Sequence, residues 1–271
     1  MTYGEGIGPL AIAHRGGAGL AEENSFAAFG LASALGLRYL ETDIRVTADG
    51  QLVCFHDETL ERVTSGTGAV RSRSLSELRA LRINGIEPIP TFDEALDAFP
   101  EQCFSVDLKE QAAIGPLVKS LRRKGVAERV CIAGAWDGWL GHVRREVPAV
   151  TTALGWRSLT ALLSCARAGL RPPKALATAP FAHVPIKLGG LPIFVDRVVA
   201  MSHDIGVRVV TWTVDEPAVM RGLLDSGVDA VITDRPDVLR EVLIQRGTWQ
   251  AAGAAQLNKP SSADLGSVLS G

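Results

Sequence analysis

The sequence has few cysteines, no long apolar run and no basic leader. Its four cysteines form no CxxC pair, which argues against a zinc site and a disulfide framework, and we interpret all four as small buried residues. They are Cys54, Cys103, Cys131 and Cys165. No apolar stretch reaches the roughly 18 residues of a membrane span, and no basic segment precedes an apolar one at the start. These absences predict no stable membrane insertion and a cytoplasmic location.

The charge balance excludes a second group of functions. The 271 residues include 28 Lys and Arg against 30 Asp and Glu, for a formal net charge of −2. Proteins that bind nucleic acid or an anionic membrane through bulk charge carry a basic surplus, which this chain lacks. We therefore expect a small-molecule partner and no nucleic acid. No apolar stripe indicates an oligomeric state.

Short apolar runs alternate with helix-like segments, the pattern of a mainly parallel sheet with helices outside it. We expect strands at 10–13, 39–46, 51–56, 103–108, 130–133, 150–155, 174–178, 208–214 and 229–233. We expect helices at 25–35, 92–99, 113–124, 136–147, 158–167, 192–205, 216–226 and 236–246. Asp49-Gly50 turns the third strand back on the second as a β-hairpin arm. The other eight strands predict an α/β fold, a (β/α)8 TIM barrel.

One domain is predicted over residues 8–247. Residues 57–102 follow the hairpin arm and contain a turn-rich loop at 64–68 and a capping-box pattern from Ser74 to Glu77. We interpret them as a small insertion over the barrel mouth. Residues 248–271 are rich in Ala, Gly and Ser without periodicity, which predicts a flexible C-terminal tail.

Carboxylates stand inside two of the expected strands. Glu41 and Asp43 are two residues apart and project to the same side, and two convergent carboxylates require a cation. Oxygen ligands without thiols suit Mg²⁺ or Ca²⁺. On the next strand, Asp107 can complete a three-carboxylate metal site, and Lys109 can reach a phosphate oxygen. The alternatives are a solvated face paired with neighbouring arginines, and a plain ion pair between Asp107 and Lys109.

Histidines stand at two strand ends. His14-Arg15 ends the first strand, and His56 ends the hairpin arm. In TIM barrels the active residues lie at the C-terminal strand ends, so we expect the two histidines to form an acid/base pair. The sequence leaves open which one donates the proton. The Arg15 guanidinium offers a fork for phosphate oxygens, and Trp212 either packs in the core or faces a substrate.

Other polar residues carry weaker signals. We interpret His142, His183 and His203 as bystanders on helices or loops without partners. Lys187 can add charge at the barrel mouth. Glu23-Asn24-Ser25 precedes a helix, and we expect Asn24 or Ser25 to be its N-cap.

Taken in order, these motifs resemble the glycerophosphodiester phosphodiesterase family, over about residues 10–245. The matching stretches are Ala13-His14-Arg15-Gly16-Gly17, Glu23-Asn24-Ser25, Glu41-Thr42-Asp43, Thr47-Ala48-Asp49-Gly50, His56-Asp57-Glu58-Thr59-Leu60, residues 64–68, Pro90-Thr91-Phe92, Asp107-Leu108-Lys109, Thr211-Trp212-Thr213-Val214-Asp215, Gly227-Val228-Asp229 and Ile232-Thr233-Asp234. The order of His-Arg, Glu-x-Asp and His-Asp is the most specific part.

The resemblance implies a (β/α)8 hydrolase of phosphodiesters that uses one divalent cation, Mg²⁺ or Ca²⁺. It implies that the metal is held by Glu41, Asp43 and Asp107, that His14 and His56 are the acid/base pair, that Arg15 and Lys109 bind phosphate, and that Trp212 lines the substrate pocket. In related enzymes the 2-hydroxyl of the substrate attacks phosphorus. The resulting cyclic phosphate is opened by water, which here gives glycerol 3-phosphate and an alcohol.

Three positions depart from the common pattern of the family. These departures bear on which ion and which alcohol the protein prefers, and not on the class of reaction. Asp107 stands where glutamate is more usual, Glu22 where proline is common and Asp215 where asparagine is frequent. One alternative function is a lysophospholipase D-like enzyme on single-chain lipids, for which Pro180-Phe181 and residues 191–194 are the apolar candidates. The other is a non-catalytic barrel that binds phosphorylated ligands.

Overall fold

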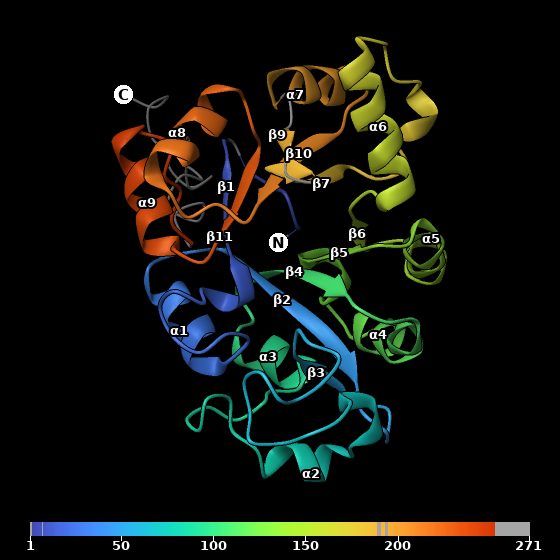
Figure 1. Cartoon of the computed structure of the whole chain (residues 1–271), viewed down its shortest axis with the longest axis vertical. Coiled ribbons are helices and arrows are strands. Elements are labelled where there is room, and N and C mark those ends of the chain that lie inside the picture. The colour runs from blue at the N-terminus through green and yellow to red at the C-terminus, as the bar shows by residue number, and fades with distance from the viewer. Residues whose placement is uncertain (1, 7, 189–190, 193–194, 253–271) are drawn as a thin grey trace, which may run out of the picture.

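Eight parallel strands form the centre of the molecule, with helices around them (Figure 1). The computed structural model describes residues 2–6, 8–188, 191–192 and 195–252. The barrel strands are β1 Leu10–Ala13, β2 Tyr39–Val46, β4 Cys103–Leu108, β5 Val130–Gly134, β6 Thr151–Thr152, β7 Phe181–Pro185, β10 Arg208–Trp212 and β11 Ala230–Thr233. They pair in the order β6-β5-β4-β2-β1-β11-β10-β7, and a parallel bridge from Ala153 to Phe181 joins the two ends. The predicted (β/α)8 barrel is confirmed.

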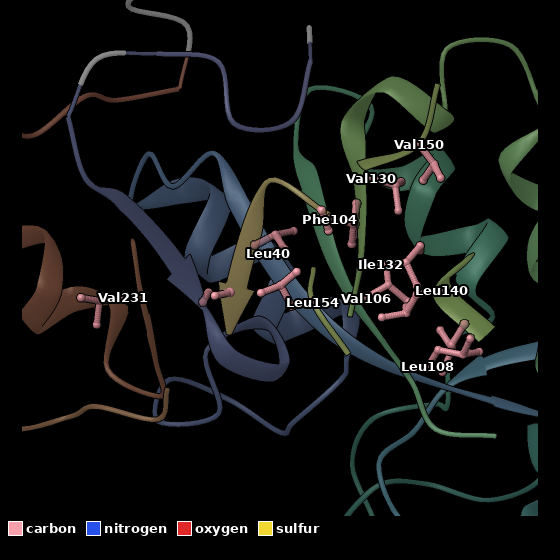
Figure 2. Close-up of a cluster of buried hydrophobic side chains, with 14 of the residues drawn as sticks. Leu40, Phe104, Val106, Leu108, Val130, Ile132, Leu140, Val150, Leu154 and Val231 are labelled. Atoms are coloured by element: carbon pink, nitrogen blue, oxygen red, sulfur yellow. The ribbon is translucent and has the colours of Figure 1, made fainter. Parts of the chain in front are cut away.

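The described residues form nine α-helices, and all but α2 lie around the outside of the barrel. They are α1 Phe26–Ala34, α2 Leu75–Arg79, α3 Phe92–Ala98, α4 Ile114–Leu121, α5 Asp137–Glu146, α6 Trp156–Ala168, α7 Val195–Asp204, α8 Pro217–Asp225 and α9 Pro236–Gln245. Side-chain caps begin several of them: the Ser25 hydroxyl accepts from the Ala28 N–H at 3.1 Å, and Thr91 forms a capping box with Glu94. The largest hydrophobic cluster lies between helices and strands, where Figure 2 shows Ile132 beside Leu140. None of the described helices is both long and apolar enough to cross a bilayer.

The predicted hairpin arm is present as β3 Leu52–Cys54. It runs antiparallel to β2, with Ile44 opposite Cys54 and Val46 opposite Leu52. Gly50 in the turn has a φ of 76°, which glycine adopts without a steric penalty. The arm brings His56 back toward the C-terminal ends of the barrel strands.

Apolar side chains fill the lower barrel interior. Tyr39, Cys103 and Phe181 belong to one buried cluster there, and Tyr3 packs edge-on against Tyr39 and Phe181 at ring distances of 5.2 and 5.5 Å. Because strand side chains alternate, the residues two positions later face the same interior. The inward residues next above this apolar layer are all polar: Glu41 and Asp43 on β2, Ser105 and Asp107 on β4, and His183 on β7.

The segment after the hairpin arm has its own small core, which contains Leu60, Val63 and Leu78. In Figure 1 its helix α2 lies beyond α3. Asn84 Nδ2 donates to Glu22 Oε2 at 2.6 Å, so Glu22 ties this segment to the loop after β1. That the segment covers the barrel mouth stays a prediction.

One expected strand is wrong. Residues 174–176 form a 3-10 helix after two prolines, and the sixth barrel strand is β7, where Phe181–Pro185 pairs with β10. The fifth barrel strand, expected at 150–155, pairs over two residues as β6. After β7 come the short paired strands β8 Lys187–Leu188 and β9 Leu191–Pro192.

The start of the expected tail lies against the barrel helices. The N–H groups of Thr248 and Trp249 donate to the Leu243 carbonyl at 2.9 and 3.1 Å, and Ala252 donates to the Gly36 carbonyl at 2.9 Å. The rest of that expectation, residues 253–271, lies outside the described residues. So do positions 193–194 of the apolar candidate for a lipid channel.

Candidate active site

A cavity of about 410 Å³ opens at the C-terminal ends of the barrel strands. All eight residues singled out as site candidates line it: His14, Arg15, Glu41, Asp43, His56, Asp107, Lys109 and Trp212. They come from four barrel strands and the hairpin arm, so the barrel brings together side chains that lie up to about two hundred positions apart in the sequence. This is the end of a TIM barrel where strand-end residues and loops form active sites.

The carboxylates converge on an ammonium group. Asp43 and Asp107 are direct register partners on β2 and β4. Lys109 Nζ lies 2.9 Å from Asp43 Oδ1 and 2.6 Å from Asp107 Oδ2. The expected alternative of an ion pair between Asp107 and Lys109 is therefore present, but it lies in the cavity. The solvated-face alternative for Glu41 and Asp43 is wrong, since both side chains are buried.

These groups shift one another's pKa. Burial raises the pKa of Asp43, but the Lys109 ammonium and His56 outweigh it and hold the pKa below its usual range. Burial lowers the pKa of Lys109, and the charges of Asp43 and Asp107 outweigh that and raise it. Burial and the neighbouring charge of Asp43 raise the pKa of Glu41 well above its usual range. The site is therefore short of positive charge beside Glu41.

The donor set fits a hard divalent cation. Within the described ranges, no three His, Cys, Asp or Glu side chains already form a group that could hold a metal ion. Yet Glu41, Asp43 and Asp107 all face one cavity, and a cationic group already lies between two of them. Carboxylate oxygens without thiol ligands are the donors that Mg²⁺ and Ca²⁺ prefer.

Each of the two predicted acid/base histidines is held by a carboxylate. His14 Nδ1 lies 2.7 Å from Asp234 Oδ1, and His56 Nδ1 lies 2.6 Å from Asp57 Oδ1. An ionised carboxylate fixes the tautomer with the proton on Nδ1, which leaves Nε2 free for proton transfer. Burial lowers the pKa of His14, but the hydrogen bond to Asp234 and the charge of Glu41 outweigh it and raise the pKa overall.

The carboxylates that hold the histidines are fixed in turn. Asp215 Oδ1 accepts from the Asp234 N–H at 2.8 Å and from the Thr233 hydroxyl at 2.9 Å. Asp57 accepts from Arg62, which also pairs with Glu23 at 2.7 Å. Asp57 and Asp234 both belong to motif stretches of the sequence, but their residue types and positions alone predict no role for them in the site.

Arg15 lies above the buried carboxylates. Its backbone is left-handed, with a φ of 49°, and its N–H donates to Glu41 Oε2 at 2.7 Å. Its Nη1 donates to Glu23 Oε1 at 3.0 Å, while Nε lies 3.5 Å from Asp43 Oδ2, is buried and has no hydrogen-bond partner. Gly16 makes the turn possible, because a Cβ there would lie 2.5 Å from the Phe29 ring.

Asn24 supports the site directly. Ser25 is the N-cap of α1, whereas Asn24 is buried, has a φ of 55° and donates from Nδ2 to Asp43 Oδ2 at 3.0 Å. Its Oδ1 accepts from the Thr42 hydroxyl at 2.7 Å. The sequence signal was the Glu-Asn-Ser motif, which we interpreted only as a helix cap.

The bystander expectation is wrong for His183, and for His203 only the expected absence of a partner is wrong. His183 is an inward residue of β7 that lines the cavity, and its buried Nε2 has no hydrogen-bond partner. Burial lowers the pKa of His183 to about 4, so it is neutral at pH 7. His203 lies on α7 with Nε2 2.7 Å from Asp229 Oδ2, so it has a partner. His142 lies exposed on α5, and the Lys187 side chain lies outside the described part of the structure.

Comparisons with known proteins agree on one family. The family model described as "Glycerophosphoryl diester phosphodiesterase family" matches residues 14–238. The chain is 36% identical over 249 residues to the protein named "Probable glycerophosphodiester phosphodiesterase 2" of Mycobacterium tuberculosis, and the match covers 90% of this chain and 94% of the relative. It is 31% identical over 255 residues to "Glycerophosphodiester phosphodiesterase" of Caldanaerobacter subterraneus, which covers 88% and 98%.

A solved structure supports the fold. The structure of an Oleispira antarctica phosphodiesterase in complex with the product sn-glycerol-3-phosphate superposes with a TM-score of 0.72 at 23% identity. The match covers 88% of this chain and 97% of that one.

Proposed function

This chain belongs to the glycerophosphoryl diester phosphodiesterase family and is a phosphoric diester hydrolase, and we propose that it hydrolyses glycerophosphodiesters, the deacylated phospholipids, to glycerol 3-phosphate and an alcohol. We assign the activity to one domain, residues 8–247, with 57–102 as an insertion. The observation that carries the proposal is the cavity at the strand ends, where two carboxylate-held histidines face three carboxylates, Arg15 and Lys109.

Glu41, Asp43 and Asp107 would hold one divalent cation, Mg²⁺ or Ca²⁺. When bound, the ion neutralises charge on the non-bridging phosphate oxygens. Lys109, whose ammonium lies between Asp43 and Asp107, would then exchange a carboxylate partner for a phosphate oxygen. The negative charge that develops on phosphorus is stabilised most where donors are already in place.

Arg15 would bind the phosphate. Its guanidinium is fixed by Glu23, and its buried Nε–H group has no hydrogen-bond partner, so it is available to a phosphate oxygen. A planar guanidinium binds phosphate oxygens through paired hydrogen bonds. Because the Arg15 backbone also contacts Glu41, the phosphate-binding group and the metal-binding group are positioned by the same turn.

His14 and His56 would move the protons. One histidine takes the proton of the glycerol 2-hydroxyl as its oxygen attacks phosphorus, and the other gives a proton to the departing alcohol. The cyclic phosphate is then opened by water with the two roles exchanged, so both histidines return to their starting states. The raised pKa of His14 keeps more of it protonated near neutral pH, which suits the proton donor of the first step.

The test is phosphate-ester turnover. We would incubate the protein with glycerophosphocholine and Mg²⁺, Ca²⁺ or EDTA, and measure glycerol 3-phosphate release through a coupled dehydrogenase. We expect release that needs a divalent ion and that falls about a hundredfold or more in His14→Ala and His56→Ala. His142→Ala, an exposed helix position, is the matched control. No release from any glycerophosphodiester with any ion would overturn the proposal.

A further inference from the structure

Four of the five tryptophans line the same cavity. They are Trp136, Trp139, Trp156 and Trp212. Three of them are also among the exposed large apolar side chains, with Trp136 at 61%, Trp156 at 40% and Trp212 at 36%. Exposed tryptophan side chains gathered at one cavity leave a large apolar surface in contact with water, which is unfavourable unless a ligand covers it. The mechanism above uses none of them, and the resemblance to the family implies a role in the substrate pocket for Trp212 alone.

We call Trp136, Trp139 and Trp156 the tryptophan wall. Trp136 and Trp139 lie at the start of α5, with ring centroids 6.0 Å apart, and Trp156 is the first residue of α6. The three tryptophans lie in the segments that follow β5 and β6, whereas the residues proposed to bind phosphate and metal come from the ends of β1, β2 and β4. The cavity therefore has a charged part and an aromatic part.

The tryptophan wall is held in place by its own backbone. The Trp156 N–H donates to the Ala135 carbonyl at 2.9 Å, beside Trp136. The Asp137 carboxylate accepts from the Arg157 N–H at 3.0 Å and from the Ser158 hydroxyl, so it caps the neighbouring helix. A Cβ at Gly155 would lie 2.5 Å from Asp137 Oδ2, so this close contact requires glycine. The two loops thus present the indoles as one preformed surface.

The surroundings of the tryptophan wall are apolar. The other cavity residues that β5, β6 and the segments after them contribute are Ala133, Gly134, Ala135, Leu154 and Leu159. Among these described residues the indole N–H is the only side-chain hydrogen-bonding group. A polyol or primary-ammonium head group finds no side-chain acceptor for its O–H or N–H donors among these residues. A trimethylammonium group donates no hydrogen bond from nitrogen and is attracted to indole faces.

We propose that the tryptophan wall binds a quaternary ammonium group on the departing alcohol, so that the preferred substrates are choline-type glycerophosphodiesters. This inference rests on the proposed function, because it places the alcohol beside a phosphate held by Arg15. Tryptophan is the aromatic residue that binds cations best.

The experiment separates the cation from its shape. We would compare kcat/KM for glycerophosphocholine with that for its neutral isostere, the 3,3-dimethylbutyl diester, and for glycerophosphoethanolamine. We expect glycerophosphocholine to be preferred over both by about tenfold. In Trp136→Leu and Trp156→Leu, which keep an apolar side chain, we expect the preference over the isostere to fall to within about twofold. Trp249→Leu, which alters a tryptophan outside the cavity, is the control and keeps the preference.

The outcomes distinguish this inference from the function on which it rests. Hydrolysis of all three diesters at similar rates would overturn the quaternary ammonium site and leave the phosphodiesterase intact. Faster hydrolysis of lysophosphatidylcholine than of glycerophosphocholine, unchanged in Trp136→Leu, would assign the wall to an acyl chain and also overturn it. No hydrolysis of any diester would instead contradict the proposed function. Because Trp136 and Trp156 are exposed, we expect thermal melting of both variants within a few degrees of the parent protein.

Discussion

Asp234→Asn tests whether the carboxylate behind His14 serves the chemistry. In the structure Asp234 Oδ1 lies 2.7 Å from His14 Nδ1, and the Asp234 backbone is fixed by Asp215. Asparagine keeps the shape and an oxygen acceptor but removes the charge. The substitution therefore asks how much of the activity depends on a carboxylate that stabilises the protonated imidazole of His14.

The magnitude follows from the strength and exposure of this contact. A hydrogen bond to a charged group contributes about 1.5–3 kcal/mol. The side chains of His14 and Asp234 are 18% and 34% exposed, so solvent screens part of the attraction and the lower end applies. A loss of about 1.4 kcal/mol in transition-state stabilisation predicts an approximately tenfold lower kcat/KM. Because the carboxylate raises the pKa of His14, its loss moves the His14 limb of the pH–rate profile to lower pH.

The assay is glycerol 3-phosphate release at saturating divalent ion across pH 5 to 9. Asp237→Asn makes the same chemical change three residues away, in an ion pair with Arg235 outside the cavity, and we expect it to leave kcat/KM and the profile unchanged. If Asp234→Asn retains the parent rate and the parent pH profile, then Asp234 does not act through His14. A rate loss without any movement of the profile would contradict the electrostatic part of the reasoning.

Three further predictions concern stability. The Arg129 guanidinium donates to the backbone carbonyls of Leu96, Phe99 and Gln102. Arg129→Met leaves these carbonyls without their donor, so we expect the free energy of unfolding in urea to fall by about 3 kcal/mol, and a fall below about 1 kcal/mol would refute this. Burial lowers the pKa of His183 to about 4, so the unfolded chain binds a proton at this residue before the folded protein does as pH falls. Between pH 7 and pH 4 the parent protein should therefore lose at most about 3 kcal/mol of unfolding free energy that His183→Leu retains, and equal losses in the two proteins would contradict this. Asn24→Ala removes the hydrogen bond to Asp43 in a left-handed position and should cost about 3 kcal/mol by thermal melting, whereas Asn24→Gly should recover about 1 kcal/mol, and equal melting temperatures of the two variants would exclude a backbone contribution.

Much of the barrel could be predicted because apolar runs and one turn carry strong local signals. The Asp-Gly turn fixed the hairpin arm and so the number of barrel strands. The sixth barrel strand, β7, could not be predicted, because His183 points inward in a strand with Pro180 before it and Pro185 at its end. Its conformation is stabilised by five register pairs with β10, and such pairing has no signature in the segment itself. The apolar run at 174–178 was mistaken for it, although two prolines before that run start a 3-10 turn.

The residues of the site also differ in how far the sequence predicts them. The two-residue spacing placed Glu41 and Asp43 on one face, and the strand-end rule gathered them with the histidines. Asp234 was assigned no role, because its contact with His14 exists only where the last strand returns beside the first. Trp136 and Trp156 also begin helices, so their sequence surroundings indicate helix starts and give no sign of a shared surface.

The barrel is not equally strong around its circumference. β2 and β4 share six register pairs, whereas β6 and β7 are joined by the bridge from Ala153 to Phe181 and one hydrogen bond of 2.7 Å from Leu154. Local opening costs least where the fewest backbone hydrogen bonds are broken. The carboxylates on β2 and β4 therefore stand on the strand pair with the most register pairs, and Trp156 stands beside the seam with the fewest backbone contacts. A change of backbone confined to that seam would alter the surface beside the aromatic part of the cavity and leave the six register pairs between β2 and β4 intact.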